Sequence, residues 1–192
     1  MSQQDIPTEF NDHNTLLSES GFASSNTWYH GTTSGLVSSI LQNGIQRSGD
    51  VELNKAIKHT MATIGNSYNE SKQPVFITQS KSLAYYWANK KTHSRNMQLA
   101  AKNEGKETPA VIEMTLPGEL QDQVKTDVGA AAFLLTGTDE YVDYVNALYS
   151  EMKLEQPNID PMTADRMDYQ NKLGMAYINK DIPAEYVKEV KA

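Results

Sequence analysis

Two short segments of the chain carry residue types that are suited to binding chemistry. They are WYHGTT at residues 28–33 and VFITQSKSLAYY at residues 75–86. In each, a short β-prone run ends in polar residues and leads directly into a helical pattern. The first presents a His-Gly pair where a strand stops, and the second presents a hydroxyl-rich turn followed by aromatic residues. Such side chains can hydrogen-bond a ligand and stack on a planar ring.

Each of these features also has an ordinary structural role when it is taken alone. A histidine at a strand end, like His30, is often a satisfied structural residue. Aromatic residues on a helix, like those that begin at Tyr85, often form core. A Ser-x-Ser turn is a common helix N-cap, because serine offers its side-chain oxygen to free helix amides. The prediction of a binding site therefore depends on the combination, order and spacing of the features.

The elements that must position these residues follow from the hydrophobic pattern. The expected elements, in chain order, are a strand from residue 28, a helix over 34–44, a long and partly helical loop over 46–73, a strand over 75–78, a helix from 80 towards 101, a strand over 110–116, a helix capped by Thr138, and two closing strands within 175–178 and 186–190. This order predicts an α+β domain whose strands pair at long range.

The chain divides into an arm and one domain. Residues 1–25 are polar and acidic, and we expect a flexible N-terminal arm. Residues 26–192 form the domain, in which 118–173 are expected to be a helical insertion. Its aromatic residues are not all expected to face one core, so some can recognise a partner; they include Tyr141, Tyr144 and Tyr149.

Composition sets the broad class of the protein. The 192 residues are 39% hydrophobic and 21% charged, as in an ordinary globular domain. No apolar run reaches the length of a membrane span, so no membrane partner is expected. The N-terminus shows no basic and apolar Sec-type signal, which predicts a cytoplasmic protein or one exported by a route without such a signal.

Charge and residue counts exclude several chemistries. The absence of cysteine rules out disulfides, thiolate metal sites and a cysteine nucleophile. The net charge of −7 disfavours a nucleic-acid partner, because phosphate binding requires a basic surface. No metal is expected, because the four histidines lack metal-ligand spacing. The chain has no P-loop, no Gly-x-Gly-x-x-Gly and no Gly-x-Ser-x-Gly motif.

Together, the two segments resemble the nicotinamide-binding halves of ADP-ribosyltransferases of the diphtheria-toxin and poly-ADP-ribose-polymerase type. That family has a His-Gly pair at the end of its first strand and a Ser-x-x-Tyr after a later strand. Ser80-Lys81-Ser82-x-x-Tyr85 matches the polymerase-type pattern. The segments PAVIEMTLP and IPAEYV also resemble closing strands of such domains, so the resemblance covers about residues 27–117 and 174–190.

The resemblance implies a split, mainly antiparallel β-sheet and a mono-ADP-ribosyltransferase activity. NAD would be the substrate, nicotinamide would be released, and a protein would be the acceptor. His30 would hydrogen-bond the adenosine-side ribose, Gly31 and Ser82 would bind the nicotinamide amide, and glycine would leave room for that ligand. Tyr85 would stack on the ring, with Tyr86 replacing it if the helix register shifts. The implied residues are His30, Tyr85 and Glu113 for catalysis, and His30, Gly31, Thr32, Arg47, Phe76, Thr78, Ser82, Tyr85 and Tyr86 for NAD.

One departure from the family concerns its third motif, a glutamate before the final Ile-Pro segment. Here that place falls on residues 174–176, which are Gly-Met-Ala. The carboxylate can come from elsewhere, with Glu113, Asp165 or Asp168 as candidates, although the alternation around Glu113 favours a solvent-facing strand residue. Alternatively, the enzyme transfers one ADP-ribose with an apolar third position, or the domain binds NAD or ADP-ribose without catalysis.

An RNA 2′-phosphotransferase is a more remote alternative with the same fold. It would use NAD to remove an RNA phosphate and would need several basic residues around that phosphate. The acidic chain shows no clear arginine constellation. Whether the protein acts as a toxin, an effector or a housekeeping enzyme stays open at this point.

Overall fold

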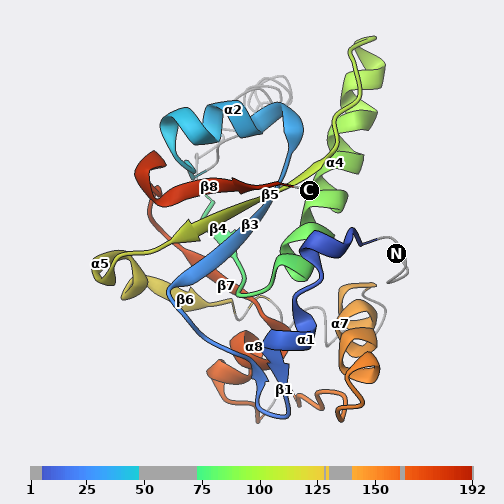
Figure 1. The fold of residues 1–192 in the computed structure, drawn as a ribbon, viewed down its shortest axis with the longest axis vertical. Coiled ribbons are helices and arrows are strands. Elements are labelled where there is room, and N and C mark those ends of the chain that lie inside the picture. The colour runs from blue at the N-terminus through green and yellow to red at the C-terminus, as the bar shows by residue number, and fades with distance from the viewer. Residues whose placement is uncertain (1–5, 48–72, 128, 130–139, 161–162, 192) are drawn as a thin grey trace, which may run out of the picture.

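Two small antiparallel sheets form the centre of the protein (Figure 1). The structure is a computed structural model that describes residues 6–47, 73–127, 129, 140–160 and 163–191. The first sheet has the order β3-β5-β8, with β3 at Thr27–Thr33, β5 at Pro109–Thr115 and β8 at Val187–Val190. The second has the order β4-β7-β6, with β4 at Val75–Ile77, β7 at Ala176–Ile178 and β6 at Val124–Thr126. The expected α+β class is confirmed.

The two sheets are connected where β3 passes the end of β4. Tyr29 and Thr78 form an isolated antiparallel bridge, with N–O distances of 2.8 and 3.0 Å. The closing strands expected near the C-terminus are confirmed as strands, but they belong to different sheets. β7 pairs with β4 and β6, whereas β8 pairs with β5. This split places Tyr29 and Gly31 of β3 beside the end of β4 and the start of the helix that follows β4, respectively.

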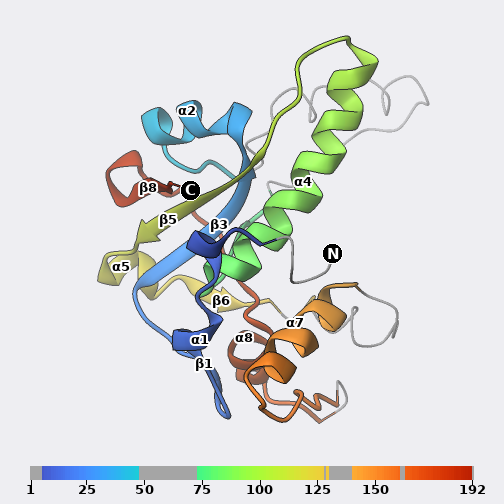
Figure 2. The same ribbon diagram turned by 45° about the vertical axis from the view of Figure 1, so that its right-hand side comes forward.

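The helices surround the sheets on two sides (Figures 1 and 2). α2 lies along the β8 edge, α4 rises across β3, and α7 and α8 lie together at the opposite end of the molecule. The α-helices of the described residues are α1 at His13–Leu16, α2 at Ser34–Asn43, α4 at Lys81–Ala101, α5 at Gly118–Gln121, α7 at Glu140–Glu151 and α8 at Arg166–Leu173. Short 3-10 helices occur at Thr8–Phe10 (η2) and Ala184–Tyr186 (η4), and β1 at Leu17–Ser18 pairs with β2 at Gly21–Phe22. None of these helices is long and apolar enough to cross a membrane.

Helix α4 begins where the Ser-x-Ser turn predicts. Ser80 is the N-cap residue, and its hydroxyl oxygen accepts from the backbone amide of Leu83. The far end of the helix is tied to β3 and to the start of β5. The Glu107 carboxylate accepts hydrogen bonds from Nε and Nη2 of Arg95, both at 2.8 Å, and from the Thr33 hydroxyl at 2.6 Å. The second half of α4 is therefore fixed relative to β3.

A cluster of tyrosines corrects the expectation for the helical insertion. Tyr141, Tyr144 and Tyr149 of α7 are all buried in one core, together with Tyr86 of α4 and Leu173 of α8. α7 packs against both α4 and α8, so it buries a wider face than it could bury against one helix. These tyrosines do not offer an exposed surface for a partner.

The region 118–173 also contains a strand that the sequence analysis missed. β6 pairs with β7, with Thr126 opposite Ala176. The run VKTD is too short for its alternation to stand out, and only pairing makes it a strand. Thr138 and most of the expected 46–73 loop lie outside the described residues.

Residues 6–25 are integrated into the protein, so a flexible arm is wrong for this stretch. Phe10, Leu17 and Phe22 are buried. Asp12 is also buried, and its carboxylate accepts from the Ser80 hydroxyl at 2.7 Å and from the Lys81 amide at 2.6 Å. Polar composition misleads here because the key polar side chain caps a helix rather than facing water. The division of the chain into domains stays a prediction.

Candidate functional site

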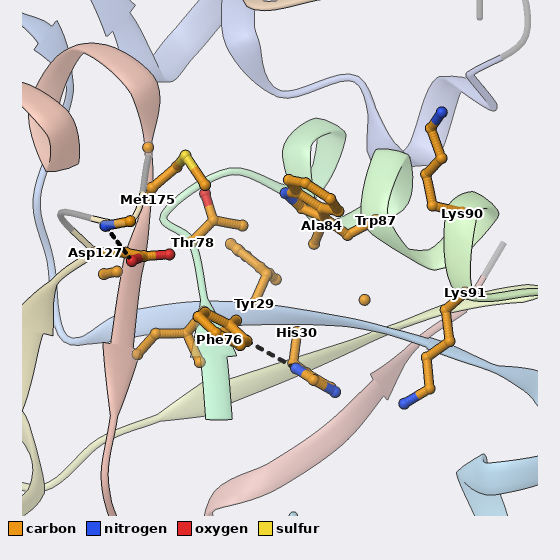
Figure 3. A pocket seen from close by; sticks show the side chains of 15 residues that line it. Tyr29, His30, Phe76, Thr78, Ala84, Trp87, Lys90, Lys91, Asp127 and Met175 are labelled. Carbon is orange, nitrogen blue, oxygen red and sulfur yellow. Dashed lines mark hydrogen bonds between the residues drawn. The ribbon is translucent and has the colours of Figure 1, made fainter. Parts of the chain in front are cut away.

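A cavity of about 530 Å³ lies where β3, β4 and β7 meet α4 (Figure 3). Its size is typical of small-molecule sites. The residues that line it are Tyr29, His30, Gly31, Phe76, Ile77, Thr78, Ala84, Trp87, Lys90, Lys91, Asp127, Gly129, Gly174, Met175 and Ala176. Both sequence segments contribute to this list, and so does the position of the expected third motif.

His30 is held at the cavity by a backbone contact across the two sheets. Its Nδ1 lies 2.9 Å from the carbonyl oxygen of Phe76. Because a carbonyl only accepts, Nδ1 carries the proton, and Nε2 of the neutral ring is an acceptor without a hydrogen-bond partner in the described part of the chain. Burial and the nearby Lys91 ammonium lower the pKa of His30 to about 4, while the Phe76 carbonyl opposes them. The ring is therefore neutral near pH 7 and offers an acceptor to a ligand hydroxyl.

Two aromatic side chains line the cavity, one from β4 and the other from α4. Phe76 on the edge strand β4 is 50% exposed, whereas phenylalanine is usually buried. Trp87 of α4 lies across the cavity from it in Figure 3, and its ring stacks on Tyr141 with centroids 5.0 Å apart. Phe76 was expected at the site, whereas Trp87 was not. Together they can hold a flat aromatic ligand group.

Positive charge lies along the α4 side of the cavity. Lys90 pairs with Glu140 and its ammonium lies 5.7 Å from the centre of the Tyr86 ring. Lys91 also lines a second groove of about 360 Å³, which runs between α2 and α4 and shares His30 and Phe76 with the first cavity. An elongated anionic ligand can therefore span both spaces past Lys91.

Gly31 lines the cavity, but the structure gives a different reason for a glycine. A Cβ on Gly31 would lie 2.2 Å from the carbonyl oxygen of Ala84 and 2.6 Å from the amide nitrogen of Ala88. The close approach that excludes a side chain is thus that of the α4 backbone. The expectation that a ligand occupies this space is corrected.

The serine and tyrosines of the second segment face away from the cavity. Ser82 is buried, and its hydroxyl donates to the Phe10 carbonyl at 2.7 Å. The Tyr85 ring stacks on Phe10, with centroids 4.7 Å apart and planes inclined by 19°. Tyr86 stacks on Tyr144 in the tyrosine core, at 5.0 Å. None of the three lines the cavity.

Of the remaining residues expected to bind NAD, one lines the cavity and two do not. Thr78 lines the cavity, although its side chain is buried and accepts from the Ser80 amide. Thr32 is fully buried outside it, and its hydroxyl has no hydrogen-bond partner among the described residues. Arg47 is paired with Asp181 through its backbone amide at 2.8 Å and its Nε at 3.7 Å. Thr32 and Arg47 do not line this cavity.

None of the three carboxylates proposed from the sequence lines the cavity. Glu113 of β5 forms an ion pair with Lys188 at 2.8 Å. Asp165 caps α8 by accepting from the Met167 amide, and Asp168 pairs with Lys172. The cavity instead contains Asp127, which directly follows β6. The only sequence signal for it is an acidic residue at the end of a short β-prone run.

Neither a metal site nor a related protein identifies the function of the cavity. Within the described part of the chain, no group of three or more histidine, aspartate or glutamate side chains could hold a metal ion. No protein-family model, no curated protein and no solved structure matches the chain.

Proposed function

We propose that the protein is a mono-ADP-ribosyltransferase that transfers ADP-ribose from NAD to a protein and releases nicotinamide. The observation that carries the proposal is the neutral His30, with its Nε2 acceptor, in a cavity that also holds Phe76 and Trp87. A ribose hydroxyl can donate to this nitrogen, and an aromatic ring can lie between the two side chains.

The arrangement of the sheets supports the finer fold assignment. Two three-stranded antiparallel sheets meet at Tyr29 in the first half of β3, which is the split form expected of an ADP-ribosyltransferase-like domain. The His-Gly pair lies on the strand that bridges to the second sheet. The cavity opens at this junction, where backbone groups of both sheets and α4 converge.

The two adjoining spaces suit a dinucleotide. The larger cavity would take nicotinamide and its ribose, and the groove between α2 and α4 would take the adenosine half. Lys91, which lines both, would neutralise the pyrophosphate between them. In this arrangement Trp87, rather than Tyr85, is the stacking residue from α4.

The chemistry required of the protein is modest once NAD is held in this way. The glycosidic bond between nicotinamide and ribose breaks with a build-up of positive charge on the ribose. Fixing the ring and the ribose at separate points aligns this bond for attack by the acceptor. His30 stays neutral near pH 7, so it adds no positive charge beside the developing cation.

The proposal is tested by calorimetric titration with NAD and by assaying nicotinamide release in the presence of a cell lysate. The intact protein should give a saturable NAD signal and release nicotinamide. His30→Ala should weaken NAD binding by about tenfold, the equivalent of one charge-free hydrogen bond. His93→Ala, an exposed change on α4, is the matched control and should leave both measurements unchanged. Absence of nicotinamide release by the intact protein would overturn the proposal.

A non-catalytic NAD-binding or ADP-ribose-binding module is the second candidate. It is favoured by Met175 and Ala176, which occupy the third-motif position in the cavity without a carboxylate. Saturable NAD binding without nicotinamide release or labelled acceptor would support the module and exclude the transferase.

A further inference from the structure

The strand that should carry the catalytic carboxylate presents only small and apolar residues to the cavity. Gly174, Met175 and Ala176 all line it, at the start of β7. A departing nicotinamide leaves positive charge on the ribose, and negative charge close to that centre lowers the barrier. Because β7 carries no carboxylate at the cavity, another element must supply this negative charge.

The neighbouring strand β6 places one carboxylate at this point. Thr126 pairs with Ala176, and the next residue, Asp127, donates its backbone amide to the Met175 carbonyl at 3.0 Å. Asp127 is thus adjacent to the vacant third-motif position, one strand over. It is the only acidic residue among the described residues that line the cavity. In Figure 3 its carboxylate lies beside Met175 and Thr78.

The surroundings hold this side chain in place while leaving it available. Oδ1 accepts from the Gly129 amide at 2.9 Å, which fixes the orientation of the carboxylate. No lysine or arginine pairs with Asp127 among the ion pairs of the described residues. The other expected carboxylates are engaged elsewhere, as Glu113 is with Lys188.

We propose that Asp127 is the catalytic carboxylate of this site, supplied by β6 in place of the third-motif residue of β7. The inference rests on the proposed transferase function. With Asp127 in this role, the missing carboxylate on β7 no longer favours a non-catalytic module.

The step that Asp127 serves can be written completely. The C1′–N bond of the nicotinamide riboside breaks, and nicotinamide leaves with the bonding electron pair. The acceptor oxygen or nitrogen forms the new bond to C1′, and its proton passes to the Asp127 carboxylate and then to water. Burial raises the pKa of Asp127 and the Gly129 amide lowers it, with burial the larger effect. A carboxylate with a raised pKa is a stronger base for this proton.

The test uses the full-length protein and separates turnover from binding. Asp127→Asn keeps the shape and the contact with Gly129 but removes the charge. Nicotinamide release should fall by about 10²–10⁴-fold in kcat, while the dissociation constant for NAD changes by less than about threefold. Asp127→Glu restores a carboxylate on a longer side chain and should recover part of the lost turnover. Asp122→Asn, the same substitution at an exposed position before β6 and outside the cavity, is the matched control and should keep full turnover.

The outcomes separate this inference from the proposed function. If the intact protein binds NAD and releases nicotinamide but Asp127→Asn does so equally well, the inference is wrong and the transferase stands. If Asp127→Asn loses binding as much as turnover, or Asp127→Glu recovers nothing while remaining folded in thermal unfolding, Asp127 has only a structural role. If the intact protein releases no nicotinamide, the proposed function itself fails.

Discussion

The two sequence segments with binding chemistry have opposite positions in the folded protein. His30 and Phe76 line the cavity at the junction of the sheets. Ser82 and Tyr85, from the turn and helix that follow Phe76, are instead covered by residues 6–18, through Phe10 and Asp12. One region is built around an open space and the other around a buried polar cap. Similar residue types therefore serve binding in one place and stability in the other.

The difference arises from the orientation of α4. Successive residues of a helix point about 100° apart, so Tyr85 and Trp87 project in nearly opposite directions. Trp87 points towards the cavity, whereas Tyr85 points towards the N-terminal segment. Spacing along the sequence identifies the helix but not its rotation, which depends on packing against other elements, including the close approach of the α4 backbone to Gly31 of β3.

The largest expected effect concerns the buried cap. Asp12→Ala should lower the free energy of unfolding by about 3–4 kcal/mol, because it leaves the Ser80 hydroxyl and the Lys81 amide buried without their charged acceptor. Urea unfolding measures this change. Asp165→Ala is the matched control, since Asp165 caps α8 in an exposed position and should cost only about 1 kcal/mol. Equal losses for the two variants would mean that residues 6–18 do not hold the start of α4.

The next prediction compares two aromatic residues of α4, Tyr85 and Trp87. Tyr85→Ala removes the stack on Phe10 and should lower the unfolding free energy by about 2 kcal/mol without changing the affinity for NAD. Trp87→Ala also loses packing, against Tyr141, but should in addition weaken NAD binding by about tenfold. Unfolding curves and calorimetric titration of both variants check the pair. Weaker NAD binding in Tyr85→Ala but not in Trp87→Ala would reverse the assignment.

Much of the architecture could be predicted from the sequence because local signals were strong. The capping serine before α4 and the expected strands β3, β4, β5, β7 and β8 are confirmed. The short β6 strand could not be predicted, because three residues carry little alternation and the strand exists through pairing with β7. Asp127 was missed for the same reason.

The cavity residues show the same division between local and long-range information. His30 and Phe76 were found because each lies in a recognisable β-prone run, although the His-Gly pair lies within β3 and not at its end as expected. Trp87 was missed because its role depends on the rotation of α4. The buried state of Asp12 was missed because it depends on partners about seventy residues away, which no local pattern reveals.

The smallest expected effect is a pH dependence that isolates His30. Its pKa is about 4 in the folded protein, against 6.5 for an ordinary histidine. Between these values the unfolded chain binds a proton that the folded protein does not, so stability rises with pH across this window and is lost as pH falls. Lowering the pH from about 7.5 to about 5.5 should therefore lower the free energy of unfolding by about 1 kcal/mol through this residue.

His30→Gln, whose amide can still donate to the Phe76 carbonyl, should remove that contribution in urea unfolding at the two pH values. The exposed change His93→Gln should leave the pH dependence intact. If His30→Gln shows the same pH dependence as the intact protein, the His30 ring is not desolvated and the cavity does not hold it neutral. The contrast between an open cavity and a buried cap would then rest on the aromatic residues alone.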